Sequence, residues 1–333
     1  MPPSPSFADW IERLPKWHGW LQLSPERAYA HAEERYDDQY GVDAPKPEDG
    51  AGLCALLQQH AIDTGGPALE IGCGTGRLSF GLARHYPGPS LLLTDPSPTF
   101  LRITQQHVGT PPNPRPRLHY AVLNGDDLAK LPPGIFSLIA MRSTLHHVRD
   151  VPAFLSACAR TLRPDGALVL GAEPCESGHV LMASIVQFIA PVLENAGVTL
   201  RPEWKQQLRV FTDTVKFYCR RDIDKATAED KHLFRVHELA DQGRACGLQL
   251  HFFPNAAFSD YAPPFLPEFE TFSVFFLNYL QYCMLFDAEF LKHIRRHLKP
   301  QLKYLDDCYR SQVGPVVTGV FLFKQGDGAS IRP

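Results

Sequence analysis

The chain has 333 residues, of which 44% are hydrophobic, so it is long enough to bury a full core as one large domain or as two lobes. Its 33 Lys and Arg residues against 36 Asp and Glu residues give a formal charge of -3, which disfavours nucleic acid or an anionic membrane as a partner. Eight scattered cysteines without a short CxxC pair favour reduced thiols in a cytoplasmic protein over a disulfide framework or a zinc site, and no metal is expected.

The first 63 residues are predicted to be a helical cap segment that precedes the main domain. The start of the chain has no basic stretch followed by an apolar run, and no later stretch has 18 uninterrupted apolar residues, so no membrane insertion is expected. Residues 25–40 are predicted to form a helix with Ser24 as its cap, and a second helix is predicted near 49–63.

From Pro67 onward, short apolar runs alternate with helical segments, which predicts a doubly wound α/β fold with a largely parallel, Rossmann-like sheet. The runs are almost continuously apolar, as expected for strands that helices cover on both faces. Residues 64–175 are assigned to this core, and 176–246 to a helical insertion. Residues 247–333 are expected to complete a seven-stranded sheet around a second helical insertion at about 255–315. The two insertions are expected to cap the substrate site.

The most specific motif is ALEIGCGTG, an apolar strand that runs into glycines 72, 74 and 76 and then into a helix. Glycines permit a sharp turn and a close approach of the backbone to a ligand. The spacing is GxGxG rather than the GxGxxG of dinucleotide-binding domains, and the GK[ST] of a P-loop is absent from the sequence. Glu70 places a carboxylate at the strand end, which suits a ligand with a positive amino group.

This motif resembles motif I of class I S-adenosylmethionine-dependent methyltransferases, and the resemblance extends over about residues 64–174. It implies that Gly72, Cys73, Gly74 and Gly76 line the site of S-adenosyl-L-methionine, while Glu70 helps to hold the amino end of that cofactor. Asp95, followed by Pro96 at the end of the second strand, is implied to accept the ribose hydroxyls. Either Asp126 or Asp127 is implied to contact the adenine. Tyr36 resembles part of an N-terminal segment that closes over the cofactor.

Methyl transfer requires alignment more than any particular residue, but a hydroxyl or protonated amine acceptor benefits from a positioned base. His146 and His147 follow the fourth strand of the predicted sheet and Glu173 follows the fifth, so each is a candidate base or substrate contact. His146 is the favoured candidate, although a histidine at a helix start can equally well have a structural role.

The function predicted from the sequence is methylation of a small molecule, with oxygen favoured as the acceptor atom. The alternatives are a small-metabolite N- or C-methyltransferase and a catalytically inactive partner subunit that binds the cofactor. The expected partner is a small-molecule substrate, and a homodimer is left open.

Overall fold

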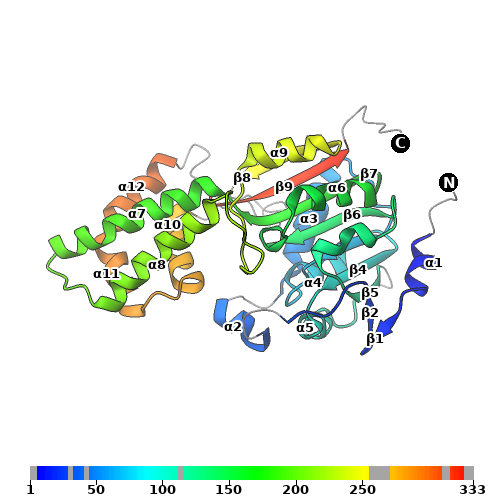
Figure 1. Cartoon of the computed structure of the whole chain (residues 1–333), viewed down its shortest axis with the longest axis horizontal. Coiled ribbons are helices and arrows are strands. Elements are labelled where there is room, and N and C mark those ends of the chain that lie inside the picture. The colour runs from blue at the N-terminus through cyan, green and yellow to red at the C-terminus, as the bar shows by residue number, and fades with distance from the viewer. Residues whose placement is uncertain are drawn as a thin grey trace.

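The computed structural model describes residues 6–28, 33–40, 45–111, 116–254, 271–309 and 316–325. Nine strands form one sheet in the order β1-β2-β5-β4-β3-β6-β7-β9-β8 (Figure 1). The central strands β3 (Ala68–Ile71), β4 (Ser90–Asp95), β5 (Arg117–Val122), β6 (Phe136–Arg142) and β7 (Leu162–Pro174) are parallel. The last two, β8 (Leu248–Pro254) and β9 (Thr318–Gln325), pair antiparallel.

The predicted doubly wound α/β fold is therefore confirmed, with one addition. Two short strands, β1 (Lys16–Trp17) and β2 (Trp20–Gln22), extend the seven expected strands at the β5 edge. They were not predicted, because two or three residues are too few to show a strand pattern.

Alternate side chains of each central strand enter cores on opposite faces of the sheet. Leu69 belongs to one core and Ala68 to the other, and both are fully buried. The first face is covered by α1 (Phe7–Glu12), α6 (Val151–Thr161) and α9 (Val236–Ala245), and the second by α3 (Pro47–Gln59), α4 (Arg77–His85) and α5 (Pro98–Val108). Continuous apolar runs follow directly from this two-sided burial.

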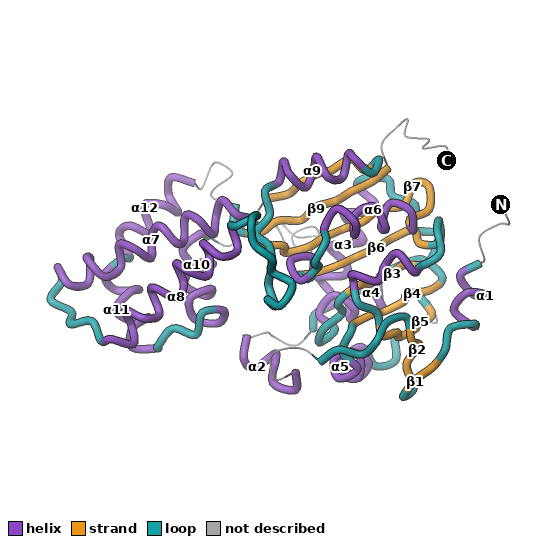
Figure 2. The backbone as a smooth tube through the Cα atoms, in the orientation of Figure 1, coloured by secondary structure: helices purple, strands orange, loops and turns teal. Residues whose placement is uncertain are grey.

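The remaining helices form a separate lobe beside the sheet (Figures 1 and 2). This helical lobe contains α7 (Glu176–Asn195), α8 (Pro202–Cys219), α10 (Phe272–Asn278) with the following π-helical turn (Tyr279–Cys283), α11 (Ala288–His297) and α12 (Lys299–Tyr309). It has its own hydrophobic core, in which Trp204 stacks on Phe290. Helix α7 is long and apolar enough to cross a membrane by composition, but its buried side chains belong to this core.

Two parts of the prediction need correction. Residues 25–28 are not helical, and the described helical turns of this region are Glu33–Arg35 and α2 (Tyr36–Tyr40). The Ser24 hydroxyl does not cap a helix; it accepts a hydrogen bond from the amide of Asn124 at 3.0 Å. In addition, α9 lies within the predicted cap insertion but packs on β8 and α6, so it covers the sheet. Part of the second insertion, 255–270 and 310–315, lies outside the described residues.

Candidate active site

A cavity of about 710 Å³ lies between the carboxyl ends of the central strands and the helical lobe. One side is formed by the loops that follow β3, β4, β5 and β6, and the other by α7, α8, the π-helical turn and residues 228–233. Parallel α/β sheets bind ligands at this edge. Among the sequence-predicted residues, those that line the cavity are Tyr36, Glu70, Gly72, Cys73, Gly74, Asp95, Pro96, His146 and His147.

The glycine loop adopts the left-handed backbone that the motif predicts. Gly72, Gly74 and Gly76 have φ values of 69°, 51° and 89°. A Cβ on Gly72 would lie 2.3 Å from the Thr144 side chain, whereas a Cβ on Gly74 would meet no protein atom within 4 Å. Gly72 is therefore required for packing, Gly74 leaves its space to the cavity, and Gly76 begins α4 as its N-cap.

Two carboxylates at the strand ends are buried beside this loop. Asp95 accepts hydrogen bonds from the amides of Gly74 at 3.0 Å and Ser97 at 2.9 Å, and burial raises its pKa to about 7. Glu70 is also buried, and burial raises its pKa to about 8. Its Oε2 atom and the Ser79 hydroxyl both lack a hydrogen bond of normal geometry among the described residues, although Ser79 is close enough to lower the pKa of Glu70 somewhat. A buried, unpartnered carboxyl oxygen that borders a cavity points to a ligand with a donor group.

Neither Asp126 nor Asp127 is among the described residues that line the cavity, and the implied adenine contact of one of them stays a prediction. The Oδ1 atom of Asp126 accepts the amide of Arg149 at 2.9 Å, and Asp127 pairs with Lys130 at 2.7 Å. Both acidic residues lie in the first turn of the short 3₁₀ helix Gly125–Lys130. Their neighbours Asn124 and Gly125 line the cavity instead.

His146 is held by Glu173, which lies behind it rather than in the cavity wall. His146 Nδ1 lies 2.9 Å from Glu173 Oε2, and because a carboxylate only accepts, Nδ1 carries the hydrogen. Glu173 also accepts the amides of Thr144 and Leu145 at 2.7 and 2.8 Å. The pairing of β7 with β9 shifts register between Leu170 and Glu173, and Ala172 has a φ of 55°. Such an irregularity bends the strand and changes the direction of the side chains that follow.

The charges of this pair depend on each other. Burial alone would lower the pKa of His146, but the hydrogen bond and negative charge of Glu173, with a contribution from Asp230, outweigh burial and raise it. Burial alone would raise the pKa of Glu173, but His146 and the backbone amides hold it below its usual range. Glu173 is therefore placed to orient and charge His146, not to contact a substrate.

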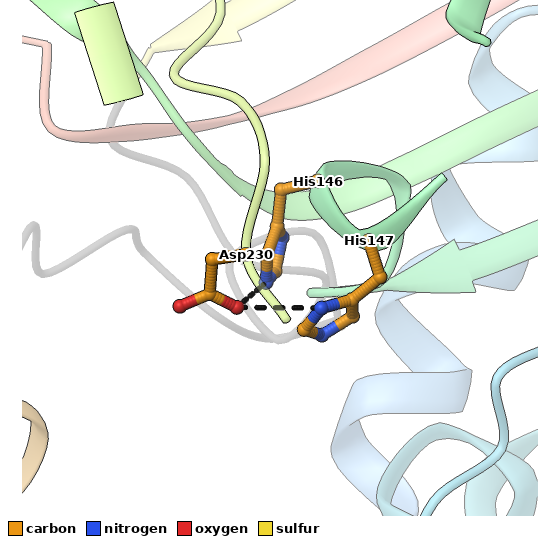
Figure 3. A group of neighbouring side chains, drawn as sticks. All are labelled: His146, His147 and Asp230. Carbon is orange, nitrogen blue, oxygen red and sulfur yellow. Dashed lines mark ion pairs between the residues drawn. The ribbon is translucent and has the colours of Figure 1, made fainter. Parts of the chain in front are cut away.

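Asp230 joins the two histidines from the loop after α8 (Figure 3). Its Oδ1 atom lies 3.6 Å from His146 Nε2 and 3.3 Å from His147 Nδ1. His147 Nδ1 also donates to the Glu229 carbonyl at 3.0 Å, and its pKa is lowered by burial and by the charge of His146. The ligand atoms of His146, His147 and Asp230 lie within 4.8 Å of one another and could also hold a metal ion, which the sequence did not lead us to expect.

The helical lobe contributes a mostly aromatic wall. Phe217, Tyr218 and Tyr279 line the cavity, as does His179 of α7. His179 Nδ1 donates to the Cys175 carbonyl at 2.8 Å, which leaves Nε2 without a hydrogen, and burial lowers the pKa of His179 to about 4. Tyr36 lines the opposite side, and burial raises its pKa to about 12. This part of the cavity wall is thus mostly apolar, with His179 and the tyrosine hydroxyls as hydrogen-bonding groups beside the carboxylate of Asp230.

Sequence reasoning missed Asp230, His179 and Arg142. Arg142 carried a usable signal, because it is a charged residue at the carboxyl end of an apolar strand, the same pattern that identified Asp95. Asp230 lies in a polar loop and His179 in an amphipathic helix, and neither environment marks a site in the sequence alone. Packing of the helical lobe against the sheet brings both to the cavity.

Comparisons with known proteins find methyltransferases. The model of the methyltransferase domain family matches residues 69–168. The chain is 33% identical over 126 residues to malonyl-(acyl-carrier protein) O-methyltransferase from Magnetococcus marinus, covering 34% of this chain and 45% of that protein. It is 33% identical over 106 residues to ubiquinone biosynthesis O-methyltransferase from Xanthomonas campestris, covering 32% and 42%. The chain thus spans less than half the length of these curated relatives.

Among solved structures, phosphoethanolamine N-methyltransferase 2 from Haemonchus contortus, in complex with S-adenosyl-L-methionine, aligns with a TM-score of 0.45 at 13% identity. The alignment covers 88% of this chain and 57% of that one. The helical lobe lies outside the segment that the family model matches.

Proposed function

We propose that this chain, whose residues 69–168 match a methyltransferase domain family, is a class I S-adenosylmethionine-dependent methyltransferase that methylates a hydroxyl oxygen of a small organic acceptor. One observation carries the proposal: His146, oriented by Glu173, faces the same cavity as the glycine loop and Asp95. The curated relatives named above are O-methyltransferases, which supports oxygen as the acceptor atom.

The residues of the cavity fit the cofactor. S-adenosylmethionine supplies an electrophilic methyl group on its sulfonium. Glu70 offers a buried carboxyl oxygen without a partner to an ammonium group, and Asp95 has further lone pairs for ribose hydroxyls. Gly74 keeps free the space that a side chain would fill. These residues would hold the two ends of the cofactor and leave its centre toward the histidines.

His146 is proposed to act as the general base. Its Nδ1–H is fixed by Glu173, so Nε2 is the atom left to take a proton from an acceptor hydroxyl. The imidazolium that forms is stabilised by Glu173 and Asp230, as in catalytic histidine–carboxylate pairs. The raised pKa of His146 strengthens it as a base, and a positioned base typically contributes about 10²- to 10⁴-fold to such reactions.

The acceptor itself is inferred to be apolar or aromatic and not anionic. Phe217, Tyr218 and Tyr279 offer ring surface, while Asp230 places a carboxylate near the histidines that would repel an anionic group. This wall favours a hydroxyl on an aromatic or similarly apolar body. N- or C-methylation and a non-catalytic cofactor-binding role are the alternatives that the experiment must separate.

Calorimetric titration with S-adenosylmethionine and S-adenosylhomocysteine is the first test. We expect one-site binding that Asp95→Ala weakens at least about tenfold, since it removes a charged acceptor worth about 1.5–3 kcal/mol. Asp241→Ala, on the exposed side of α9, is the matched control and should bind as the wild type does. Failure of the wild type to bind either compound would refute the proposal.

Turnover is tested by formation of S-adenosylhomocysteine with a panel of phenols and other small alcohols. His146→Ala should retain cofactor binding and lose turnover by about 10²-fold or more. Turnover of amines but not of hydroxyl compounds would move the proposal to N-methylation. Repeating the assay with EDTA distinguishes a base from a metal site at the histidines, because a base does not depend on the metal.

A further inference from the structure

Two arginines meet one aspartate at the corner of the cavity where β6 ends. Arg142 is the last residue of β6, Arg77 is the first of α4, and Asp49 lies in the first turn of α3. Helices α3 and α4 approach closely here, because a Cβ on Gly50 would lie only 2.1 Å from the Gly81 backbone. The two glycines thus let Asp49 reach both arginines. Arg77 and Arg142 both line the cavity.

The charges at this corner do not balance. Asp49 Oδ2 lies 3.1 Å from Arg77 Nε and 3.8 Å from Arg142 Nε, so one carboxylate faces two guanidinium groups. Only the first contact is a hydrogen bond, and Arg142 Nε has no hydrogen-bond partner among the described residues. Burial, followed by the charge of Arg77, lowers the pKa of Arg142 to about 10, so the group stays protonated at neutral pH.

The next nearest acidic groups do not cancel this excess. Glu173 contributes to the environment of Arg142, but its carboxylate is paired with His146. Glu70 is largely protonated at neutral pH in the ligand-free protein, since its pKa is raised to about 8 by burial. A buried cation with an unsatisfied donor is costly unless an anion meets it. This wall of the cavity is therefore built to receive a negative group.

The sheet register places that positive corner beside Glu70. Glu70 lies opposite Ala140 in the pairing of β3 with β6, and Arg142 follows Ala140 by two residues. Side chains two residues apart on a strand project from the same face, so Glu70 and Arg142 project from one face at the same edge. An acceptor for an ammonium group and a donor for an anion thus project from the same face of the sheet at the same edge, which suits the amino-acid end of an α-amino acid.

We propose that Arg142, supported by Arg77, binds the α-carboxylate of the methionine part of the cofactor while Glu70 binds its ammonium group. This inference rests on the proposed function, because it assumes that S-adenosylmethionine occupies the cavity. A guanidinium fork bonds a carboxylate at two points, so Arg142 also fixes the orientation of the amino-acid end. Asp49 acts as a positioning residue that holds both arginines toward the cavity.

Calorimetry with three ligands tests the assignment without turnover. S-adenosylhomocysteine has both groups, its decarboxylated analogue 5′-deoxy-5′-(3-aminopropylthio)adenosine keeps only the amine, and 5′-methylthioadenosine lacks both. In Arg142→Met, we expect the affinity for S-adenosylhomocysteine to fall by about 10- to 150-fold, which corresponds to the loss of hydrogen bonds to a charged group. The affinities for the other two ligands should stay unchanged. Arg142→Lys should give an intermediate loss, and Arg117→Met, at the exposed start of β5, should give none.

Thermal stability of the free protein separates this function from a structural role. Because the Nε atom of Arg142 is buried without a hydrogen-bond partner among the described residues, Arg142→Met should fold with a Tm equal to or above that of the wild type. Equal weakening of all three ligands, or a lowered Tm with unchanged selectivity, would overturn the inference and leave the proposed function standing. Failure of the wild type to bind any of the three would overturn both. If Arg142→Met does not fold, selective loss in Arg142→Lys decides the question.

Discussion

Replacing Glu173 with Gln probes the centre of the proposed site and needs no acceptor. The carboxylate is fully buried and accepts the amides of residues 144–146 and the ring of His146. The amide group of Gln has one acceptor oxygen and places two hydrogens against some of these donors. Removing one partner of a buried pair costs about 3–5 kcal/mol, so we expect a loss of that size in the free energy of unfolding.

The pKa of His146 provides the sharper readout. In the wild type, burial of His146 would lower its pKa, but the hydrogen bond and the negative charge of Glu173 raise it by more. In Glu173→Gln, burial persists and only Asp230 remains, so the pKa of His146 should fall below its value in the wild type. NMR of the ring nitrogens follows this titration directly. The surface variant Glu289→Gln breaks the exposed pair with Arg201 and should cost at most about 1 kcal/mol, with no effect on His146.

The pH dependence of stability follows from the same pair. The raised pKa of His146 adds stability below its ordinary value of 6.5, and this is lost as pH rises through the raised pKa. The lowered pKa of Glu173 adds stability above its ordinary value of 4.5, and this is lost as pH falls through the lowered pKa. The pair therefore contributes most between 4.5 and 6.5. Urea unfolding from pH values below 4.5 to values above 6.5 should show a flatter profile for Glu173→Gln than for the wild type. An unchanged profile together with an unchanged His146 titration would refute the reasoning.

Three further outcomes are expected. Binding of S-adenosylhomocysteine at pH 7 should release a proton, because its ammonium group lowers the pKa of Glu70 from about 8, whereas binding of 5′-methylthioadenosine should not. Calorimetric titrations in two buffers of different ionisation enthalpy measure the number of protons released. Glu70→Gln should abolish the difference in proton release between the two ligands. Gly72→Ala should lower thermal stability, since its Cβ meets Thr144, whereas Gly74→Ala should stay folded and bind S-adenosylhomocysteine weakly in calorimetry because its Cβ enters the cavity. Lys225→Met leaves two backbone carbonyls without their donor and should cost about 1–3 kcal/mol in unfolding, with faster hydrogen exchange in the loop that follows.

The parts of the fold that depend on local pattern were predictable. Helices α7 and α8 lie within the helical insertion predicted at 176–246, and strands β8 and β9 lie within the segment 247–333 that was expected to complete the sheet. Each is long and has a buried side, so the pattern is strong. The predicted start of the helix at residue 25 was wrong for the opposite reason, whereas the described residues 33–40 are helical. Ser24 and Pro25 look like a local helix start, but the Ser24 hydroxyl bonds Asn124, 100 residues away, and this long-range contact is invisible in the local sequence.

The same distinction applies to the site. The glycine loop, Glu70 and Asp95 come from a contiguous motif and two strand ends, and sequence reasoning brought them together correctly at the cavity. Asp126 and Asp127 fit a family pattern, but the amide of Arg149 and the amine of Lys130 hold them elsewhere. Whether a carboxylate faces a ligand or a neighbouring donor depends on tertiary contacts that the motif does not encode.

The loop from 220 to 233 shows how the two halves of the cavity are joined. Lys225 donates to the carbonyls of Tyr218 and Lys231, and the amide of Lys231 donates to the carbonyl of His146 at 2.8 Å. These bonds fix Asp230 beside the histidines while the loop leaves the helical lobe. The proposed base is thus positioned from both sides, by Glu173 of the sheet and by a loop of the lobe.

The helical lobe has a core of its own, separate from the two cores of the sheet. Side chains such as Phe217 and Tyr279 can therefore change without disturbing the strands that carry Glu70 and Asp95. In this architecture the cofactor half is constrained by backbone geometry, because the left-handed glycines and strand ends leave little freedom. The acceptor half is constrained mainly by side-chain packing, which tolerates substitution more readily. Acceptor specificity should therefore reside in the lobe, and exchanging its aromatic wall should alter the acceptor while cofactor affinity stays the same.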